Sequence, residues 1–380
     1  MKYETLAIHG GERAEGVPGV NVPIELSTTF VQKGLHDYQD YQYSRGNNPT
    51  RHYTETLVAS LEDAKHALAT SSGMAASSLV FGLFKQGDRV LFSSNVYGGT
   101  YRYFSNLFED RGITGELVHD VNSLESEDLK GIRAIFIETP SNPLLDVYDI
   151  AHIASLAHEN NALLIVDNTF MTSYFQKPLK LGADIVVYSA TKYYGGHSDV
   201  IAGLVVTDND DLYTKLKFLH NTYGNILSPF DSFLIQRGIK TLGVRLDRHQ
   251  NNALRIAEYL NNHKAIKKVY YPGLQTHPNH DVQIKQARGY GAVLSFVLND
   301  DYDSKKFVDS LSIIDLAVSL GGIESLICHP ASMTHESYPV ELQEKIGIEE
   351  GLLRLSVGIE NIDDLLEDIE QALNNAYKGE

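Results

Sequence analysis

Between residues 88 and 192, short apolar runs alternate with amphipathic stretches, and this alternation constrains the fold more than any other feature of the sequence. The apolar runs are "DRVLFSS", "RAIFIETP", "NALLIVDNT" and "ADIVVYSATK". The stretches between them include "GTYRYFSNLFEDRG" and "DIAHIASLAHENN", which have helical spacing. Strands that are hydrophobic on both faces and are joined by helices are typical of parallel sheets. The sequence therefore predicts an α/β fold with a mainly parallel central sheet and helices outside it.

We expect three parts along the chain. Residues 1–55 are rich in Gly, Pro, Asn and Tyr and show no sustained period, which predicts an irregular arm. So long an arm is unusual unless it has a use, such as packing against another subunit. Residues 56–237 would form the large domain, which starts with one helix over "TETLVASLEDAKHALAT" and opens another at "ATSSGMAA". Residues 238–380 would form a smaller α+β domain.

The smaller domain has its own pattern of expected elements. "RLDRHQNNALRIAEYLNNH" predicts a long amphipathic helix, and "NIDDLLEDIEQALNNAY" predicts an acidic helix at its end. Strands are expected in "GAVLSFVL" and "LLRLSVG".

Charge and cysteine content limit the classes of partner. The 380 residues carry a net charge of −17, which argues against duplex DNA or an anionic membrane as the main partner, because both attract basic surfaces. The first residues lack the apolar segment of a secretory signal, and no apolar run is long enough to span a membrane. Cys328 is the only cysteine, so an intrachain disulfide is impossible. We expect a cytoplasmic protein.

Polar residues stand at the end of the apolar runs, where open parallel sheets bind their ligands. A further polar turn opens the helix expected after residue 70. The residues concerned are Ser71, Ser72, Gly73, Met74, Glu138, Thr139, Asn142, Asp167, Asn168, Thr169, Ser189, Thr191 and Lys192. Any one of these groups could simply cap a helix or face solvent, but capping explains all of them together less well than a shared binding site does.

Three of these groups match the needs of an aldehyde-bearing pyridine cofactor with a phosphate. A lysine amine such as that of Lys192 can form a Schiff base with an aldehyde when its pKa is lowered. A carboxylate such as that of Asp167 keeps a pyridine nitrogen protonated, and the ring then accepts electrons. A helix N-terminus with hydroxyl side chains, as at Ser72, Gly73 and Met74, binds phosphate.

The chain resembles the cystathionine γ-synthase and γ-lyase family, the Cys/Met metabolism group of enzymes that use pyridoxal 5′-phosphate (PLP). The likeness extends from "IHGG" at residues 8–11 to "LRLSVGIE" at residues 353–360. Between them lie, in order, "YSRGNNPTR", "SSGMAA", "NVYGGTYR", "ETPSNP", "VDNTF", "SATKYYGGHSD" and "SLGGIESL". The resemblance implies the fold of aspartate aminotransferase, known as fold type I, with PLP as the cofactor.

The resemblance also implies roles for individual residues. Lys192 would bind the cofactor covalently and move protons, Asp167 would pair with the ring nitrogen, and Tyr97 would stack on the ring and take part in proton transfer. The phosphate would be bound by groups of the same subunit, namely the backbone of Gly73 and Met74 and the hydroxyls of Ser189 and Thr191.

Other implied roles concern the substrate and the neighbouring subunit. Arg354 would bind the substrate carboxylate, with Asn142 and the backbone of Ser325 assisting, and Glu324 would meet the distal ammonium of cystathionine. Tyr43 and Arg45 would reach the phosphate of the neighbouring subunit, which implies a homodimer with shared active sites and, in most relatives, a homotetramer.

The expected reaction is α,γ-elimination of L-cystathionine to L-cysteine, 2-oxobutanoate and ammonia, with release of hydrogen sulfide from homocysteine or cysteine as a further activity. Cystathionine γ-synthase and then β-lyase are the alternatives within the family. A PLP-binding module without activity would lack the lysine, the aspartate or the arginine, and all three are present. Cys328, His329 and His335 match no common zinc spacing, so no metal is expected.

Overall fold

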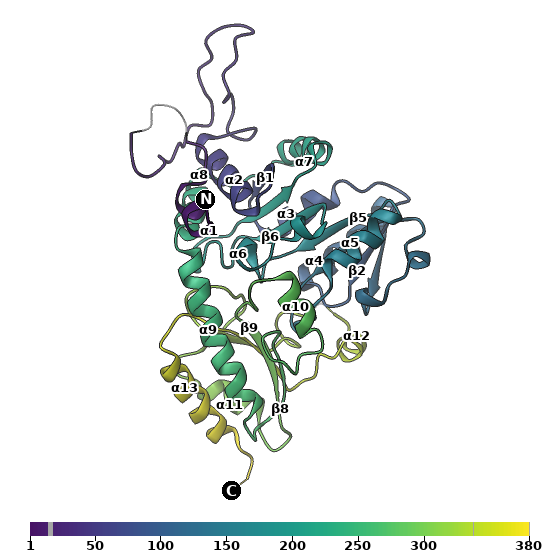
Figure 1. The fold of residues 1–380 in the computed structure, drawn as a ribbon, viewed down its shortest axis with the longest axis vertical. Coiled ribbons are helices and arrows are strands. Elements are labelled where there is room, and N and C mark those ends of the chain that lie inside the picture. The colour runs from purple at the N-terminus through teal and green to yellow at the C-terminus, as the bar shows by residue number, and fades with distance from the viewer. Residues whose placement is uncertain (14–17, 337, 380) are drawn as a thin grey trace.

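The computed structural model describes residues 1–13, 18–336 and 338–379. Residues 14–17 of the expected N-terminal arm lie outside this range. Within the described chain, a seven-stranded sheet has the order β1-β7-β6-β5-β4-β2-β3, and a five-stranded sheet has the order β10-β11-β12-β9-β8 (Figure 1). The strands of the larger sheet are β1 (His66–Thr70), β2 (Arg89–Ser93), β3 (Thr114–Val118), β4 (Ile132–Glu138), β5 (Leu163–Asp167), β6 (Ile185–Ser189) and β7 (Gly203–Thr207).

The expected parallel core of the larger sheet is present. β3, β2, β4, β5 and β6 pair in parallel, whereas β7 is antiparallel to both of its neighbours, β6 and β1. Successive side chains of these strands enter two hydrophobic clusters: in β4, Ala134 and Phe136 join one, and Ile135 and Ile137 join the other. The sheet is therefore buried on both faces, which explains the continuous apolar runs.

Different helices cover the two faces of the larger sheet. One face packs against α3 (Gly73–Phe81), α4 (Gly98–Leu107) and α7 (Asp210–Tyr223). The other face packs against α2 (Pro49–Glu62), α5 (Ile150–Glu159), α6 (Thr172–Phe175) and α8 (Pro229–Ile239). The short 3-10 helices of this region are η1 (Glu109–Arg111), η2 (Val121–Ser123), η3 (Ser126–Leu129) and η4 (Pro178–Leu181).

The long helix α9 (Leu242–Asn261) runs from the larger sheet toward the smaller one (Figure 1). The smaller sheet comprises β8 (Ile266–Tyr270), β9 (Val293–Leu298), β10 (Asp315–Leu316), β11 (Leu326–Cys328) and β12 (Leu352–Ser356). The remaining helices of this part are α10 (His280–Gln286), α11 (Ser304–Ser310), α12 (Val340–Lys345) and α13 (Ile362–Ala376). The expected strands and both expected long helices are present here.

Two expectations about local structure are wrong. The helix expected over residues 54–70 ends at Glu62, and "HALAT" forms strand β1, because Asp63 adopts a left-handed conformation that ends the helix. The arm is not entirely irregular either, since α1 (Tyr3–His9) lies within it and its Tyr3 and Ala7 are buried.

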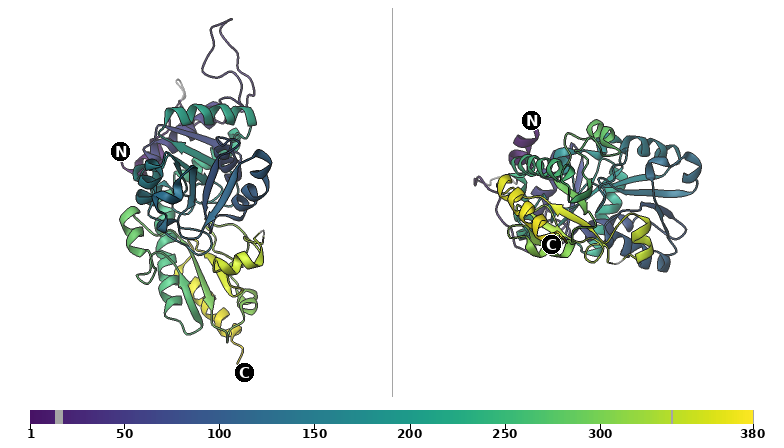
Figure 2. Two further views of the ribbon diagram at one scale, coloured as in Figure 1. Left: turned by 90° about the vertical axis from the view of Figure 1, so that its right-hand side faces the viewer. Right: turned by 90° about the horizontal axis from the view of Figure 1, so that it is seen from below.

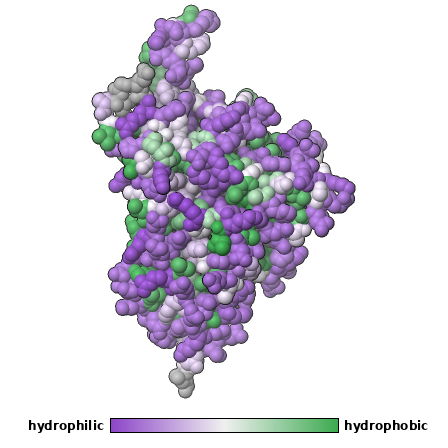
Figure 3. Space-filling view, in the orientation of Figure 1, coloured by the Kyte–Doolittle hydropathy of each residue, from purple (hydrophilic) through white to green (hydrophobic). Residues whose placement is uncertain are grey.

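Part of the described arm after α1 stays on the body of the protein, where Val22 packs against the core, and part of it leaves the body. Residues 28–44 form a projecting loop that doubles back on itself through a bridge between Thr29 and Tyr43 (Figures 1 and 2). Within this loop, Val31 and Leu35 are 89% and 91% exposed. The same projection rises above the mostly hydrophilic face shown in Figure 3. Within the described residues, no helix combines the length and the apolar character that crossing a membrane requires.

Candidate active site

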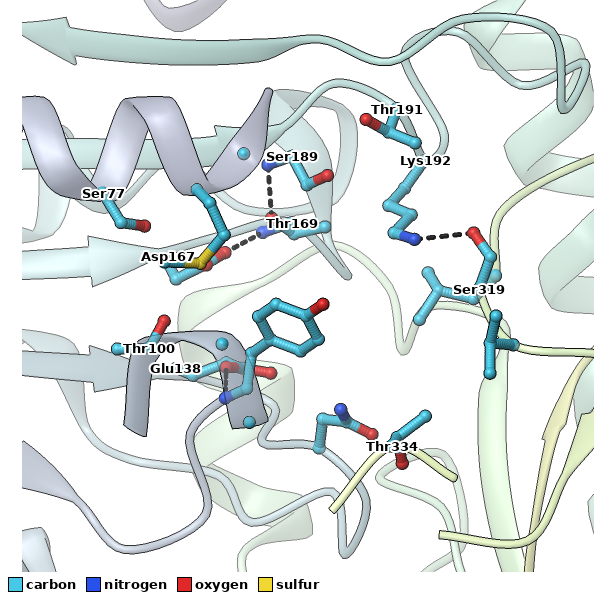
Figure 4. A pocket seen from close by; sticks show the side chains of 18 of the residues that line it. Ser77, Thr100, Glu138, Asp167, Thr169, Ser189, Thr191, Lys192, Ser319 and Thr334 are labelled. Carbon is cyan, nitrogen blue, oxygen red and sulfur yellow. Dashed lines mark hydrogen bonds between the residues drawn. The ribbon is translucent and has the colours of Figure 1, made fainter. Parts of the chain in front are cut away.

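A cavity of about 700 Å³ opens at the carboxyl ends of the parallel strands. Its walls come from the loops after β2, β4, β5 and β6, from the start of α3, and from residues 318–320, 333, 334, 336 and 354 in the C-terminal part of the chain. This volume is typical of a small-molecule site, and its position is the one expected for an open parallel sheet. Figure 4 shows that polar side chains from both domains point into it.

Lys192 extends into the cavity from the turn that follows β6. Its Nζ donates a hydrogen bond to Ser319 Oγ at 2.6 Å (Figure 4). Burial lowers the pKa of Lys192 to about 8, and the positive charge of Arg354 acts in the same direction. An amine with this pKa is neutral far more often than an ordinary lysine at neutral pH, which suits it to be a nucleophile and a base.

Two carboxyl groups lie side by side on the floor of the cavity. Asp167 ends β5 and is the register partner of Glu138 at the end of β4, so both side chains leave the same face of the sheet. Burial raises the pKa of Asp167 to about 6, although hydrogen bonds from Thr169 oppose the shift. Burial and the neighbouring charge of Asp167 raise the pKa of Glu138 well above its usual range. A cation beside Asp167, such as a protonated ring nitrogen, would keep its carboxylate ionised.

The N-terminus of α3 forms another wall. Ser72 caps this helix, since its Oγ accepts a hydrogen bond from the Ala75 N–H at 3.0 Å. A Cβ on Gly73 would lie 2.7 Å from the Cβ of Ser189 and 2.9 Å from its Oγ, so only glycine lets the helix start approach β6 this closely. Backbone amides and a hydroxyl therefore converge where the helix dipole favours an anion.

Tyr97 and Thr191 also line the cavity. Tyr97 precedes α4, its ring is 45% exposed, and its backbone N–H donates to Glu138 Oε2 at 2.8 Å. The hydroxyl of Thr191 donates to the carbonyl of Ala202 at 3.1 Å and accepts from the Ala202 N–H at 3.0 Å.

Arg354 comes from β12 in the smaller domain and is only 3% exposed. One guanidinium nitrogen donates to Asn142 Oδ1 at 3.0 Å and another to the carbonyl of Ser319 at 2.7 Å. Within the described part of the chain its Nε has no hydrogen-bond partner. A buried guanidinium without a carboxylate needs an anionic partner, and a substrate carboxylate meets this need.

Two predicted substrate residues are not brought into the site. The backbone N–H of Ser325 donates to Glu360 at 2.5 Å and its hydroxyl donates to the same carboxylate at 2.9 Å, so Ser325 is engaged away from the cavity. Glu324 is exposed, accepts a hydrogen bond from Ser198 Oγ and does not line the cavity. The roles of Ser325 and Glu324 toward the substrate therefore stay predictions.

Of the two serines in the "SLGGIESL" segment, Ser319 at its start lines the cavity. Its φ of 92° lies in a region that non-glycine residues rarely adopt, and its carbonyl and hydroxyl contact Arg354 and Lys192. No feature of the sequence alone separates Ser319 from Ser325. The sequence also gave no indication that Arg102, Met333, Thr334 and Glu336 line the cavity.

Tyr43 and Arg45 do not line the cavity of their own chain. Both are exposed at the base of the projecting loop, where the guanidinium of Arg45 lies 5.6 Å from the ring centre of Tyr43 and donates to the carbonyl of Asn221 at 2.6 Å.

The residues present fit PLP. A lysine amine for the aldehyde, a carboxyl group for the ring nitrogen, a tyrosine for the ring face and a helix N-terminus for the phosphate line the same cavity. Gly73 has no side chain where it approaches Ser189, so its backbone is accessible to a phosphate. The Nε of Arg354 has no hydrogen-bond partner within the described residues, so a carboxylate can bind beside it.

Comparisons with known proteins agree with this geometry. The model of the family described as "Cys/Met metabolism PLP-dependent enzyme" matches residues 4–374. A cystathionine β-lyase of Lactococcus lactis subsp. cremoris (strain MG1363) is 50% identical, over 97% of this chain and 98% of its own. A cystathionine γ-lyase of Bacillus subtilis (strain 168) is 48% identical, over 99% of this chain and 100% of its own. The crystal structure of cystathionine γ-lyase from Lactobacillus plantarum complexed with L-serine is 44% identical, with a TM-score of 0.95 over 99% of both chains.

Proposed function

The chain belongs to the Cys/Met metabolism PLP-dependent enzyme family, and from this premise we propose that it is a cystathionine γ-lyase. It is a PLP-dependent carbon–sulfur lyase with the fold of type I PLP enzymes. The proposed reaction converts L-cystathionine and water into L-cysteine, 2-oxobutanoate and ammonia. Release of hydrogen sulfide from homocysteine or cysteine would be a further activity of the same site.

When bound, PLP supplies an aldehyde for the substrate amine and a ring that accepts electrons from the substrate carbon chain. Lys192 would bind this aldehyde in the resting enzyme. Asp167 would hold a proton at the ring nitrogen, Tyr97 would cover the ring, and the phosphate would lie against Gly73, Met74, Ser189 and Thr191. Arg354 would bind the substrate α-carboxylate in a charge-assisted pair, with Asn142 holding the guanidinium in place.

One observation carries the proposal of γ-elimination. Lys192 Nζ lies at Ser319 Oγ, and the carbonyl of Ser319 accepts from Arg354, so the base lies directly beside the proposed carboxylate clamp. A γ-elimination requires proton removal from Cα and then from Cβ, and both carbons of an amino acid held by Arg354 would lie near this amine. With a pKa lowered to about 8, Lys192 can alternate between base and acid near neutral pH.

Cystathionine β-lyase is the second candidate. It needs only the first proton removal, and the cited Lactococcus lactis relative of that name is as similar to the chain as the Bacillus subtilis γ-lyase is. The similarity of the sequences therefore supports the family and does not rank the two activities.

Product analysis of the PLP-loaded enzyme tests the proposal. L-cystathionine should yield cysteine and 2-oxobutanoate, and the Lys192→Ala variant should yield neither above the background of free PLP. Homocysteine and pyruvate would mean a β-lyase. Silence with cystathionine, together with cystathionine formation from an O-acylhomoserine and cysteine, would mean a γ-synthase.

We also propose that the protein is a homo-oligomer whose active sites are shared in a dimer, and that two dimers form a tetramer. The projecting loop supports this, because Tyr43 and Arg45 lie outside their own cavity and the exposed apolar side chains of the loop have no cover in one chain. A reducing, cytoplasmic location would suit the single cysteine, Cys328, which is buried.

A further inference from the structure

We propose that Glu138 is a positioning residue, whose neutral carboxyl group fixes the backbone of Tyr97 and thereby aims the Tyr97 ring across the cofactor site. This inference rests on the place that the proposed function gives to Tyr97 against the cofactor. It assigns a role to a carboxyl group that the proposed reaction does not otherwise use.

The contact itself is direct. Glu138 ends β4, is 5% exposed, and accepts a hydrogen bond from the Tyr97 N–H at 2.8 Å through Oε2 (Figure 4). The backbone N–H of Glu138 is in turn 3.3 Å from Ser93 Oγ at the end of β2. The carboxyl group therefore ties the loop after β2, which carries Tyr97, to the central strand β4.

Glu138 holds the N–H side of the Tyr97 backbone, whereas the Tyr97 carbonyl accepts from the N–H groups of Thr100 and Tyr101 in α4. Tyr97 is the N-cap residue of α4 but makes no capping hydrogen bond through its side chain, and two glycines follow it. A Cβ on Gly99 would lie 2.5 Å from the Tyr97 ring and 2.8 Å from the sulfur of Met74, so the ring rests on a bare backbone. The direction of the ring thus follows the backbone at position 97, whose N–H side Glu138 holds.

The surroundings of Glu138 favour its neutral form. Asp167 stands next to it on β5, and two carboxylates this close repel each other. Burial and then the Asp167 charge raise the pKa of Glu138, while the Tyr97 N–H and the Arg354 charge oppose the shift only in part. The phenols of Tyr148 and Tyr338 lie close enough for their pKa values to respond to the Glu138 charge. When Glu138 is neutral, Asp167 carries the negative charge that would pair with the ring nitrogen. The neutral Glu138 carboxyl group still accepts the hydrogen bond from the Tyr97 N–H.

The test compares three substitutions in the PLP-loaded enzyme. Glu138→Gln keeps an acceptor oxygen at full length without a charge, Glu138→Leu removes the acceptor, and Glu138→Asp keeps the carboxyl group but is one methylene too short to reach Tyr97. The readouts are the visible circular dichroism of the bound cofactor and its dissociation constant, neither of which requires a substrate. Each variant is first checked for native far-ultraviolet circular dichroism.

We expect the PLP dissociation constant of Glu138→Gln to stay within about twofold of the wild-type value, because a neutral amide replaces a neutral acid. Glu138→Leu and Glu138→Asp should weaken the visible signal and raise the dissociation constant roughly tenfold, as expected when one buried donor loses its partner. If Glu138→Leu does not fold, the comparison of Glu138→Gln with Glu138→Asp is sufficient to test the proposal. A Gln variant as impaired as the Asp variant would overturn the neutral-acid role.

A double-substitution cycle tests whether Glu138 acts through Tyr97. Glu138→Gln and Glu138→Asp should differ in visible circular dichroism with Tyr97 present and should be alike in a Tyr97→Leu background. An equal difference in both backgrounds would show that Glu138 acts independently of the ring and would overturn the proposal. Formation of pyruvate from cystathionine by the wild type would refute γ-elimination but leave this inference standing.

Discussion

At the scale of single residues, the chemistry of this protein depends on placing ionisable groups where they are poorly solvated. Lys192, Asp167 and Glu138 share one cavity, and burial is the largest cause of the pKa shift of each. Such shifts favour the neutral form of each group, and they disfavour the folded protein until a cofactor or a substrate compensates.

The loss of folding stability caused by burying the charged amine of Lys192 can be measured in the cofactor-free protein. Its pKa is lowered from 10.5 to about 8, so unfolding takes up a proton between these values and stability rises with pH across that window. Below pH 8 the folded protein bears the full cost of a buried charge. We therefore expect Lys192→Met to be more stable than the wild type at pH 7, by at most about 3 kcal/mol, and to lose this advantage by about pH 10.5.

Urea unfolding of both cofactor-free proteins at several pH values measures this difference. Lys345→Met, at an exposed position of α12, serves as the control and should show no such pH dependence. If Lys192→Met and Lys345→Met respond to pH in the same way, the amine of Lys192 is not desolvated in the folded protein.

The sequence predicted the cofactor side of the cavity better than the substrate side. Asp167 and Ser189 end buried strands and Lys192 follows the second of them, and the ends of parallel strands meet at one edge of a sheet, so their convergence could be inferred. The proposed substrate side is built by a loop in the C-terminal part of the chain. There the choice between Ser319 and Ser325 depends on a backbone conformation that only the folded protein reveals.

At the scale of secondary structure, the junction of α3 with β6 would form the proposed phosphate end of the site. We expect Gly73→Ala to force this helix away from the strand, because its Cβ would lie 3.0 Å or less from three atoms of Ser189, including the Cα. The predicted result is a loss of PLP affinity of about tenfold or more, as one or more hydrogen bonds to the phosphate lengthen. Equilibrium dialysis against PLP measures the effect.

Gly351→Ala is a matched control, since its Cβ would meet only Val297 at 3.6 Å, an ordinary contact distance. Native-like PLP affinity in Gly73→Ala would mean that the helix start does not hold the phosphate.

Most elements could be predicted from periodicity, and the exceptions have physical causes. "HALAT" continues the apolar pattern of α2, and the left-handed Asp63 that separates the two is not a glycine, so no helix stop signal stands at this position. The antiparallel direction of β7 was also beyond prediction, because a strand buried on both faces looks the same in either direction.

At the scale of the whole molecule, the projecting arm suggests that one chain is an incomplete enzyme. The loop exposes Val31 and Leu35 almost fully, and burying such apolar side chains against a partner would be favourable. Tyr43 and Arg45 lie at the base of the same loop, away from their own cavity. A second copy that receives this loop would cover its exposed apolar side chains. The loop would in turn bring the phenol of Tyr43 and the guanidinium of Arg45 to the proposed phosphate end of the second copy's cavity.

Complementation between two inactive variants tests this arrangement. Lys192→Ala lacks the base, and the double variant Tyr43→Ala/Arg45→Ala lacks the arm residues, so each homodimer should be nearly inactive. In a mixed dimer with shared sites, one site combines both defects and the other combines an intact lysine with an intact arm. Random reassembly of equal amounts should then restore about a quarter of the wild-type activity, since half of the dimers are mixed and each has one intact site.

Reassembly after mild denaturation, followed by assay with the preferred substrate, gives the measurement. Reassembling each variant alone provides the baseline, and a wild-type sample treated in the same way corrects for losses. Activity of the mixture no higher than the mean of the two baselines would place every catalytic group within one chain, because mixing then repairs nothing. A gain requires that the arm of one subunit serves the lysine of the other.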